Sequence, residues 1–287
     1  MKTMDEGNLK ALVSLLDDDD REVLVHVENQ IISLGDTVIP YLEMEWEKNF
    51  NPLVQKRIED LIHTVQFDGL KRKLVVWKED GGKDLLEGLW LVATYQYPDM
   101  EFDKLRATIE QIYYETWLEL KNNLHPIDQI KIINDVLFGK LKFGANTKNF
   151  HSPSNSMINI VLESKKGNPI ALCAIYMLVA QKLKLPVYGV NLPNLFILTY
   201  KTDDSQFYIN AFNKGLIFSR SDIDNYLQHL NINPAPIFYE PCSHIDIIKR
   251  VFRNLIVSYE KTADADKVEE VKELLRSLSD RDDPEII

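Results

Sequence analysis

Hydrophobic positions recur at helical spacing near the start of the chain. A run of four aspartates ends at Asp20, and acidic side chains suit the N-terminus of a helix. Gly35 follows as a C-terminal stop. Between them lies one apolar stripe, formed by Val23, Val27, Ile31 and Leu34. The pattern predicts an amphipathic helix and then a second helix near residues 37–48, with Pro40 in its first turn.

A second apolar stripe follows the first by 31 positions, at Val54, Ile58, Ile62 and Val65. Asn51 and Pro52 open this third helix, and Glu59 follows Glu28 at the same offset. The repeat resembles stacked helical hairpins of the HEAT type, in which each unit buries its stripe on its neighbour. Two unrelated amphipathic helices would match equally well, so both interpretations stay open.

Three further helices are expected before the centre of the chain. Residues 84–97 predict a buried helix, and residues 100–122 predict a longer amphipathic helix with Asp103 placed to cap it. A third helix over residues 125–143 stops near Gly144.

The centre of the chain changes character. Residues 155–190 predict a helix, a glycine turn, a buried helix and a strand. Three or four short antiparallel strands are expected over about residues 187–217, where β-branched and aromatic residues are bounded by Asn, Gly and Asp. Residues 219–230 predict a capped helix, and a helical hairpin follows that turns near residues 262–266. The tail, 281–287, is expected to fray.

Composition and charge narrow the classes of function. Of 287 residues, 45 % are hydrophobic and 27 % charged, and no apolar run of about 18 residues predicts a membrane span. The net charge is −11 and the pI about 5.1, so nucleic-acid binding is not expected, and the basic triplet Lys71–Lys73 is interpreted as a solvated helix face. The N-terminus lacks a signal-peptide core, and two cysteines cannot form a disulfide framework. We therefore expect a cytoplasmic protein without membrane contact.

Several segments resemble one known family. Residues 167–176 carry the motif G-x-P-[IL]-x-L-x-x-[IL]-Y, followed by L-x-L-P at 183–186 and FYINAFNKG at 207–215. Together with DLLEGLWLVATYQYPDM upstream, they resemble the bacterial transglutaminase-like family of regulators of SirC expression. In that family a transglutaminase-like domain precedes a TPR-type helical tail. Residues 251–275 of this chain resemble the start of that tail. The resemblance covers roughly residues 84–275.

The resemblance, joined to the periodic pattern, implies an α+β fold that is mainly helical. Residues 1–68 would form HEAT-like helical hairpins. Residues 69–235 would form a helical segment and a papain-like, transglutaminase-like core with a small antiparallel sheet. Residues 236–287 would form a TPR-like helical hairpin and tail.

The wider superfamily uses a Cys-His-Asp site, and the resemblance implies that all three positions are replaced here. The cysteine position falls at Pro169 or within two residues of it, at Ala171. The histidine position falls at Leu195 and the aspartate position at Asn210. Leucine cannot accept a proton, and asparagine carries no charge to stabilise an imidazolium. Since loss of one triad member commonly costs about 10³- to 10⁶-fold in rate, we expect a fold without this chemistry.

Other reactive side chains are weaker candidates. Cys173 lies one helical turn after Pro169 and is the fallback nucleophile, although its apolar neighbours favour core packing. Cys242 and His244 would need two more ligands to bind a metal, and we interpret them as loop residues. His151 is interpreted as a surface or loop-stabilising residue. No motif for a metal, nucleotide or other cofactor is present, and none is expected.

Four asparagines fall in the segments that the resemblance brings around the former catalytic groove: Asn155, Asn168, Asn194 and Asn210. Each also suits a helix cap or a left-handed turn. Together they are candidates to line a polar, uncharged ligand groove.

Three functions follow from these observations. The leading hypothesis is a non-catalytic scaffold that interacts with, or regulates, a protein partner, because repeat-like helices usually present binding surfaces. The second is a cysteine-dependent hydrolase or acyltransferase that uses Cys173. The third is a binder of small molecules or peptides in the degenerate groove, and the oligomeric state stays open.

Overall fold

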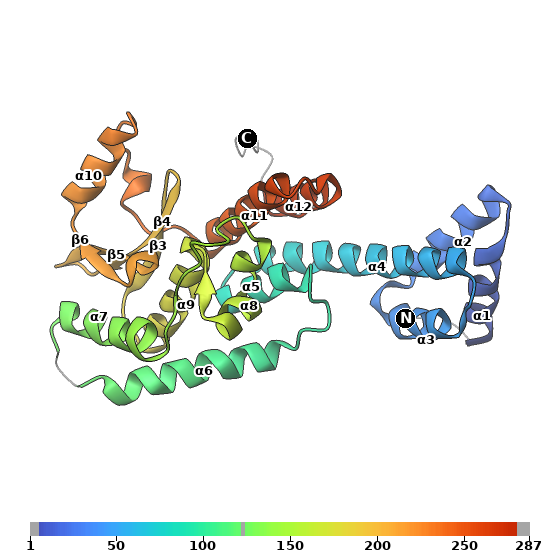
Figure 1. Cartoon of the computed structure of the whole chain (residues 1–287), viewed down its shortest axis with the longest axis horizontal. Helices are drawn as coiled ribbons and strands as arrows, with labels where there is room; N and C mark the ends of the chain where they lie inside the picture. The colour runs from blue at the N-terminus through green and yellow to red at the C-terminus, as the bar shows by residue number, and fades with distance from the viewer. Residues whose placement is uncertain (1–5, 122–123, 280–287) are drawn as a thin grey trace. The chain divides into compact units, whose positions relative to one another are not determined.

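The computed structural model describes residues 6–121 and 124–279, in which twelve α-helices and two small sheets form a mainly helical α+β fold (Figure 1). The predicted fold class is confirmed. The predicted fraying of residues 281–287 lies outside the described residues. Contacts between residues divide the chain into two units, 1–73 and 74–287.

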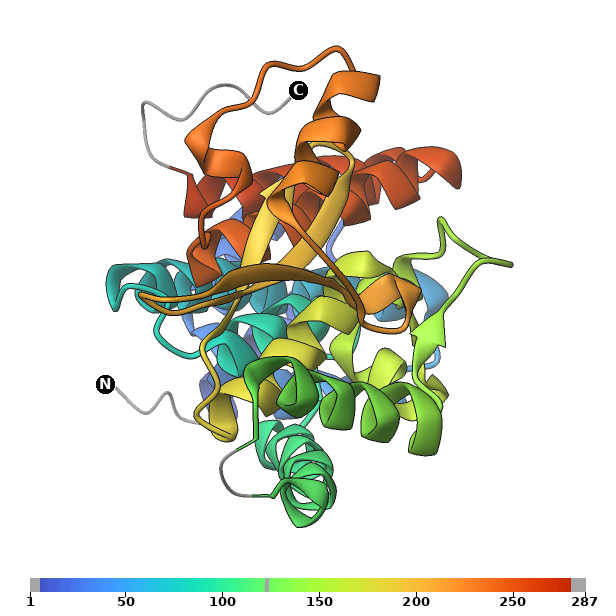
Figure 2. The ribbon, with the colours of Figure 1, turned by 90° about the vertical axis from the view of Figure 1, so that its left-hand side faces the viewer.

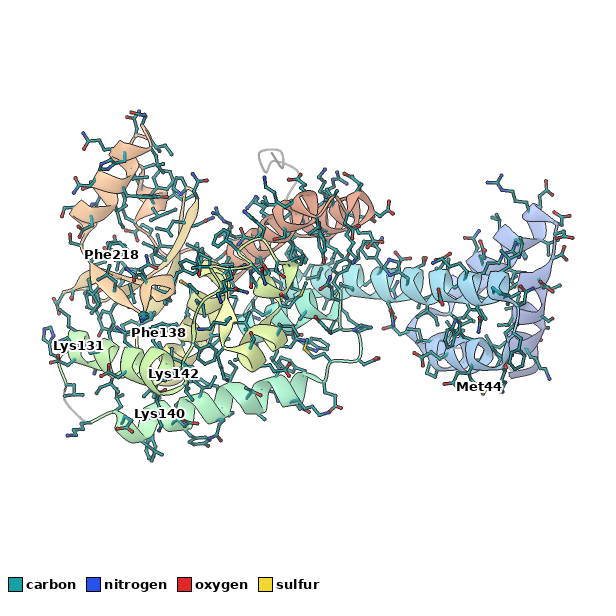
Figure 3. All side chains as sticks on the ribbon, viewed as in Figure 1. Met44, Lys131, Phe138, Lys140, Lys142 and Phe218 are labelled. Carbon is teal, nitrogen blue, oxygen red and sulfur yellow. The ribbon has the colours of Figure 1, made fainter. Side chains whose placement is uncertain are left out.

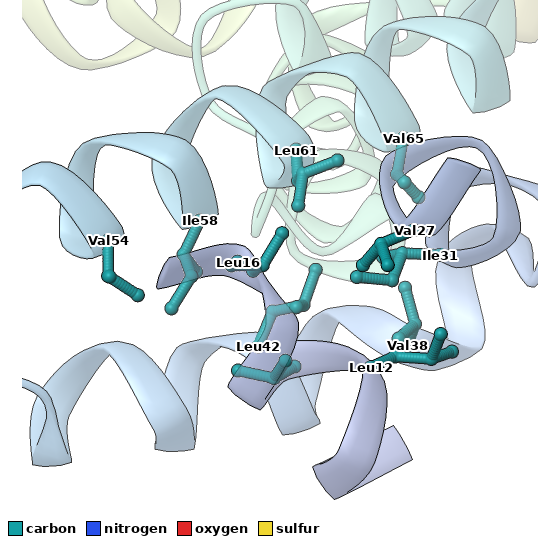
Figure 4. Packing of buried hydrophobic residues seen from close by; sticks show 11 residues of the cluster. Leu12, Leu16, Val27, Ile31, Val38, Leu42, Val54, Ile58, Leu61 and Val65 are labelled. Carbon is teal, nitrogen blue, oxygen red and sulfur yellow. The ribbon is translucent and has the colours of Figure 1, made fainter. Parts of the chain in front are cut away.

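The first unit is a small helical core. It contains α1 (Glu6–Ser14), α2 (Arg21–Ser33), α3 (Ile39–Lys48) and the start of α4 (Pro52–Glu79). Asp20 caps α2 by accepting a hydrogen bond from the backbone N–H of Glu22, and Gly35 follows the helix at φ +65°. Figure 4 shows the apolar side chains that meet between these helices. Five of the eight predicted stripe positions are fully buried there: Val27, Ile31, Val54, Ile58 and Val65.

Helix α4 crosses the predicted boundary between the first two segments of the chain. It continues as a single 28-residue helix through residues 68–69, where the sequence placed a boundary. Gly69 has a packing role instead, because a Cβ at this position would lie 2.6 Å from Asp36 Oδ1. Asp36 in turn lies 3.8 Å from Arg72 Nη2 and 3.1 Å from Lys73 Nζ. Two members of the basic triplet therefore face Asp36, and the third, Lys71, pairs with Asp68 at 2.7 Å.

The second unit holds the remaining helices. They are α5 (Leu85–Thr94), α6 (Phe102–Glu119), α7 (Pro126–Asn134), α8 (Ile158–Ser164), α9 (Pro169–Lys182), α10 (Arg220–His229), α11 (His244–Lys261) and α12 (Ala265–Leu278). A π-helical turn, Asp135–Lys140, extends α7. The predicted hairpin at the C-terminus is the pair α11 and α12.

Local caps explain where several of these helices begin. Asp84 accepts hydrogen bonds from two backbone N–H groups at the start of α5. Ser219 forms a capping box at α10, as the sequence predicted for this segment, and Ser243 forms another at α11. The expected cap at Asp103 is wrong. The N-cap position of α6 is Glu101, two residues before the expected one, so Asp103 lies in the first turn of the helix.

Four strands make the predicted antiparallel sheet. They are β3 (Val187–Leu192), β4 (Leu195–Lys201), β5 (Gln206–Asn210) and β6 (Leu216–Phe218), paired in chain order. Pro193 and Asn194 form the two-residue turn between β3 and β4, and Asn194 has φ +58°, which asparagine tolerates. A two-residue parallel ladder between β1 (Gly144–Ala145) and β2 (Lys166–Gly167) was not predicted, because so short a pair leaves no periodic pattern.

Helix α9 is the centre of this unit. It packs against β3, β4 and α6, and ten of its fourteen residues are buried. The other face of the sheet packs against α10 in a separate cluster that includes Ile197, Tyr208 and Leu227. Figure 2 shows α10 on the side of the sheet away from α7.

One polar network ties α7 and α9 to the sheet. Asn134 Nδ2 donates to the carbonyl oxygen of Gly215 at 2.9 Å, and its Oδ1 accepts from the Tyr176 hydroxyl at 3.0 Å. Phe138, labelled in Figure 3, stacks on the Tyr176 ring with 6.1 Å between centroids. Gly215 has φ +75°, and a Cβ there would lie 1.9 Å from Asn134 Oδ1. Glycine is required at this position by both its backbone and its space.

We expect Gly215→Ala to lower the free energy of unfolding of the second unit by roughly 1–3 kcal/mol. Urea unfolding followed by tryptophan fluorescence measures the change. Gly81→Ala is the matched control, because Gly81 also has a positive φ, +81°, but its Cβ would meet no atom within 4 Å. Equal losses for the two variants would contradict the close approach of Asn134.

Candidate functional site

The start of α9 is the centre of the candidate site, because the resemblance places the superfamily cysteine there. Asn168 Oδ1 accepts a hydrogen bond from the backbone N–H of Ala171 at 2.9 Å, and Asn168 Nδ2 donates to Ser156 Oγ at 2.7 Å. Pro169 suits the first turn, where a missing N–H breaks no helical hydrogen bond. Both ends of the Asn168 amide are used, so this helix start is firmly held.

A pocket of about 440 Å³ lies beside this helix start. Its walls come from the first turn of α9, the β3–β4 turn, the loop that contains Phe150, and one face of α11. The wall is apolar at Phe150, Phe196 and Val257, and polar and uncharged at Asn194 and Asn254. Apolar walls with a few polar groups are typical of small-molecule sites.

Two arginines of α11 supply the permanent charge of the pocket wall. Arg250 Nη1 donates to Asn191 Oδ1 at 3.2 Å. Burial lowers the pKa of the Arg250 guanidinium, and the charge of Arg253 lowers it further. Arg253 has no hydrogen-bonding or ion-pairing partner among the described residues, and no acidic side chain of that part of the chain lines the pocket. The pocket is therefore positive in a chain of net charge −11.

Of the positions that the resemblance assigns to a catalytic triad, Pro169 alone lines the pocket within the described chain. Ala171 is buried inside the helix packing. Leu195 packs with the α10 cluster, whereas its neighbour Phe196 lines the pocket, as the alternation of side chains along a strand requires. A side chain at position 195 therefore points away from the start of α9.

The four candidate asparagines separate into two pairs. Asn168 and Asn194 line the pocket. Asn155 is buried, and its Nδ2 donates to two loop carbonyl oxygens at 2.7 and 3.0 Å, which closes the preceding loop. Asn210 caps the short helix η5 (Ala211–Asn213) through its side-chain oxygen. The structure gives the second pair local roles in the backbone.

Cys173 is enclosed in the protein. Its side chain is completely buried in α9, and Sγ lies 3.5 Å from the carbonyl oxygen of Phe196. Burial raises the pKa of the thiol to about 12. The thiol therefore stays protonated, and Cys173 is not part of the pocket wall.

The remaining candidates have structural partners. The backbone N–H of Cys242 donates to the carbonyl oxygen of Gly189 at 2.8 Å, and burial raises the pKa of the Cys242 thiol to about 12. His244 Nδ1 lies 2.8 Å from the carbonyl oxygen of Gly82. Across the described ranges, no three His, Cys, Asp or Glu side chains gather to hold a metal ion. His151 is exposed and lines the pocket, with its ring edge-on to the neighbouring phenylalanine at 5.2 Å.

The pocket residues of α11 were missed by the sequence analysis. Arg250, Arg253 and Asn254 lie three and four positions apart, a spacing that puts side chains on one face of a helix. That spacing was visible in the sequence, but an exposed polar face has the same pattern. The packing of α11 against the start of α9 is what distinguishes a pocket-lining face from an exposed polar face.

Comparisons with known proteins agree on the central region. A family profile described as the transglutaminase-like superfamily matches residues 103–253. A UPF0162 protein of Xylella fastidiosa (strain 9a5c) is 29 % identical over 201 residues, which cover 64 % of this chain and 68 % of the relative. UPF0162 protein YchA of Escherichia coli (strain K12) is 27 % identical over 174 residues, covering 60 % and 64 %. F-box only protein 21 of Mus musculus is 29 % identical over 173 residues, covering 50 % of this chain and 28 % of that protein. No solved structure matches the chain.

The fold and the site define a mainly helical α+β protein with a pocket at the start of its central helix. The chain belongs to the transglutaminase-like superfamily, because the match spans residues 103–253, more than half of its length. Among the helices that the structure describes, none combines the length and apolar character that a membrane span requires.

We expect Asn168→Ala to lower the free energy of unfolding by about 1–2 kcal/mol, because it removes the N-cap acceptor of α9. Asn168→Asp keeps an acceptor for the backbone N–H of Ala171 and loses only the donor to Ser156, so its loss should be smaller. Urea unfolding of both variants tests this order. The cap assignment fails if Asp destabilises the protein as much as Ala.

Proposed function

We propose that this chain is a non-catalytic member of its superfamily, of the SirC-regulator type, that acts as a protein-interaction or regulatory scaffold. The main observation in support of the proposal is that the candidate thiol, Cys173, is buried away from the pocket. The pocket wall offers Pro169 where the superfamily cysteine would lie, while the nearest cysteine in sequence, Cys173, is sealed in the core with a pKa of about 12.

Thiol catalysis needs a thiolate, a base within hydrogen-bonding reach and a group that orients the base. In the described structure Cys173 Sγ has two backbone partners, the carbonyl oxygen of Phe196 and a hydrogen bond from the backbone of Ala211, and neither group can take the thiol proton. His151 is the histidine of the pocket wall, but Cys173 is absent from that wall. Leu195, at the implied histidine position, lies against the opposite face of the sheet. These placements support binding as the role of the domain.

The scaffold role rests on the helical segments around the core. Such helical arrays usually present protein-binding surfaces, although a fold alone does not dictate function. Partner capture with the tagged full-length chain, quantified by mass spectrometry, should recover the same partner with wild type and with Cys173→Ala. Partner capture that requires an intact Cys173 would argue against a scaffold and for a covalent intermediate.

A second candidate function is favoured by the pocket itself. A cavity of about 440 Å³ with mixed apolar and polar walls has the size and lining of a small-molecule or peptide site. Ligand binding and scaffolding are compatible, because a ligand held between α9 and α11 can bias the surface that these helices present.

The rival enzyme hypothesis makes a sharp prediction for Cys173. In a Cys242→Ser variant, iodoacetamide near neutral pH should leave Cys173 unmodified in the native protein and add one adduct after unfolding in guanidinium, because only the thiolate reacts. Intact-mass spectrometry measures the adduct. A Cys173→Ser variant, which retains Cys242, is the matched control. Rapid labelling of native Cys173, with amine transfer or amide hydrolysis that Cys173→Ala abolishes, would overturn the non-catalytic proposal.

The raised pKa of Cys173 also predicts a dependence of stability on pH. The folded thiol has a pKa of about 12 against an ordinary 9.0, so above pH 9 the unfolded chain loses this proton before the folded chain does. The unfolded state then binds fewer protons, and stability falls between pH 9 and pH 12. Cys173→Ala removes this contribution, so the free energy of unfolding should fall less steeply than in wild type, by up to about 1.4 kcal/mol per pH unit. Parallel profiles for the two proteins would contradict the burial of an ionisable thiol.

A further inference from the structure

We propose that the pocket between α9, α11 and the β3–β4 turn binds an organic anion, whose carboxylate or phosphate group is held by Arg250 and Arg253. This inference rests on the ligand-binding candidate function proposed above and names the chemical class of the ligand.

The charge of the pocket points to an anion. The chain has 44 acidic and 33 basic residues, yet both permanently charged side chains of the described pocket wall are arginines. Arg250 makes a hydrogen bond to a neutral amide, Asn191 Oδ1, and Arg253 has no protein partner among the described residues. A guanidinium carries five N–H donors, so the pair has several donors left for a ligand.

Placing two like charges together has a cost that an anion would remove. Arg250 and Arg253 lie one helical turn apart on α11, and both are only partly exposed. Burial lowers the pKa of Arg250, and the repulsion from Arg253 lowers it further. A carboxylate or phosphate between them would attract both guanidinium groups and so offset their repulsion. Both oxyanions match the fork geometry of a guanidinium, which favours arginine over lysine at such sites.

The remaining lining describes the rest of the ligand. Asn194 and Asn254 offer neutral amide donors, and the N-terminal end of the α9 dipole faces the same space. Phe150, Phe196 and Val257 form an apolar wall on which an aromatic or aliphatic body can pack. The fitting ligand is therefore an oxyanion carried on an apolar body, and the pocket volume of about 440 Å³ suits a small molecule or the end of a peptide.

Titration calorimetry with matched probes tests the charge requirement. N-acetylphenylalanine and phenyl phosphate carry the proposed oxyanion on an aromatic body, and inorganic phosphate carries it alone. N-acetylphenylalaninamide has the same body without the charge. We expect both aromatic anions to bind the full-length chain, more weakly as salt increases, and the neutral amide to bind at least about tenfold more weakly. A peptide ending in a free phenylalanine carboxylate separates a peptide source from a small-molecule source, because a peptide site would bind it more tightly than N-acetylphenylalanine.

Variants test the residues. Arg253→Gln should weaken binding of both aromatic anions by roughly ten- to a hundredfold, since it removes a charged hydrogen-bond donor. Arg253→Lys should keep part of the affinity. Arg276→Gln, on the exposed face of α12 and outside the pocket, is the matched control and should bind as wild type does. The melting temperature without ligand should not fall in Arg253→Gln, because the substitution also removes the repulsion with Arg250.

The inference is overturned if no anion binds, if the neutral amide binds as tightly as the acid, or if Arg253→Gln binds both anions as wild type does. A lowered melting temperature of ligand-free Arg253→Gln would also count against it, since the arginine would then have a structural role. The non-catalytic proposal fails on a different result, namely turnover that depends on Cys173. If no anion binds and Cys173 is inert, the anion-binding inference fails and the non-catalytic scaffold proposal still stands.

Discussion

The burial of α9 on every side is the constraint on which the rest of this protein depends. The helix is hydrophobic around its whole circumference, so it can be stable only when strands, helices and loops cover all of its faces. The sheet covers one side through β3 and β4, α6 covers another, and α11 lies across its start. Two polar side chains that this arrangement encloses, Tyr176 and Asn168, have hydrogen-bonding partners.

That packing separates two properties that an active site would have to combine. A side chain one turn into the helix, such as Cys173, is shielded from water and from ions. The first residue of the helix, Pro169, remains at the pocket. Pro169 is therefore accessible but carries no reactive group, whereas Cys173 carries a thiol that does not reach the pocket. The main chemical feature of the pocket is then its positive charge, because Arg250 and Arg253 face the same space and no carboxylate of the described structure lines it.

Local features of the fold could be predicted from the sequence, because their causes are local. The stripe through Val27 and Ile31, the cap at Asp20 and the turn at Asn194 each depend on a few neighbouring residues. The length of α4 could not be predicted in this way. The sequence placed a segment boundary between residues 68 and 69, but α4 runs through both. Asp36, 33 positions before Gly69, occupies the space that a side chain at residue 69 would fill.

The site was harder to predict, because it too depends on contacts between residues that lie far apart in the sequence. The sequence analysis selected Asn155 and Asn210 as pocket candidates, but their side-chain amides hydrogen-bond within their own loops. It also aligned Leu195 with a catalytic position, whereas the strand directs that side chain to the other face of the sheet. The helical spacing of Arg250 did not distinguish a pocket residue from a surface residue, because its hydrogen-bonding partner, Asn191, lies 59 positions away.

The composition of the pocket wall has a consequence for how the pocket can vary. The family profile matches residues 103–253, which include Arg250 and Arg253, whereas the wall continues along α11 through Asn254 and Val257 to Ser258. Substitutions at these last three positions would reshape the pocket without altering either arginine or any residue of α9.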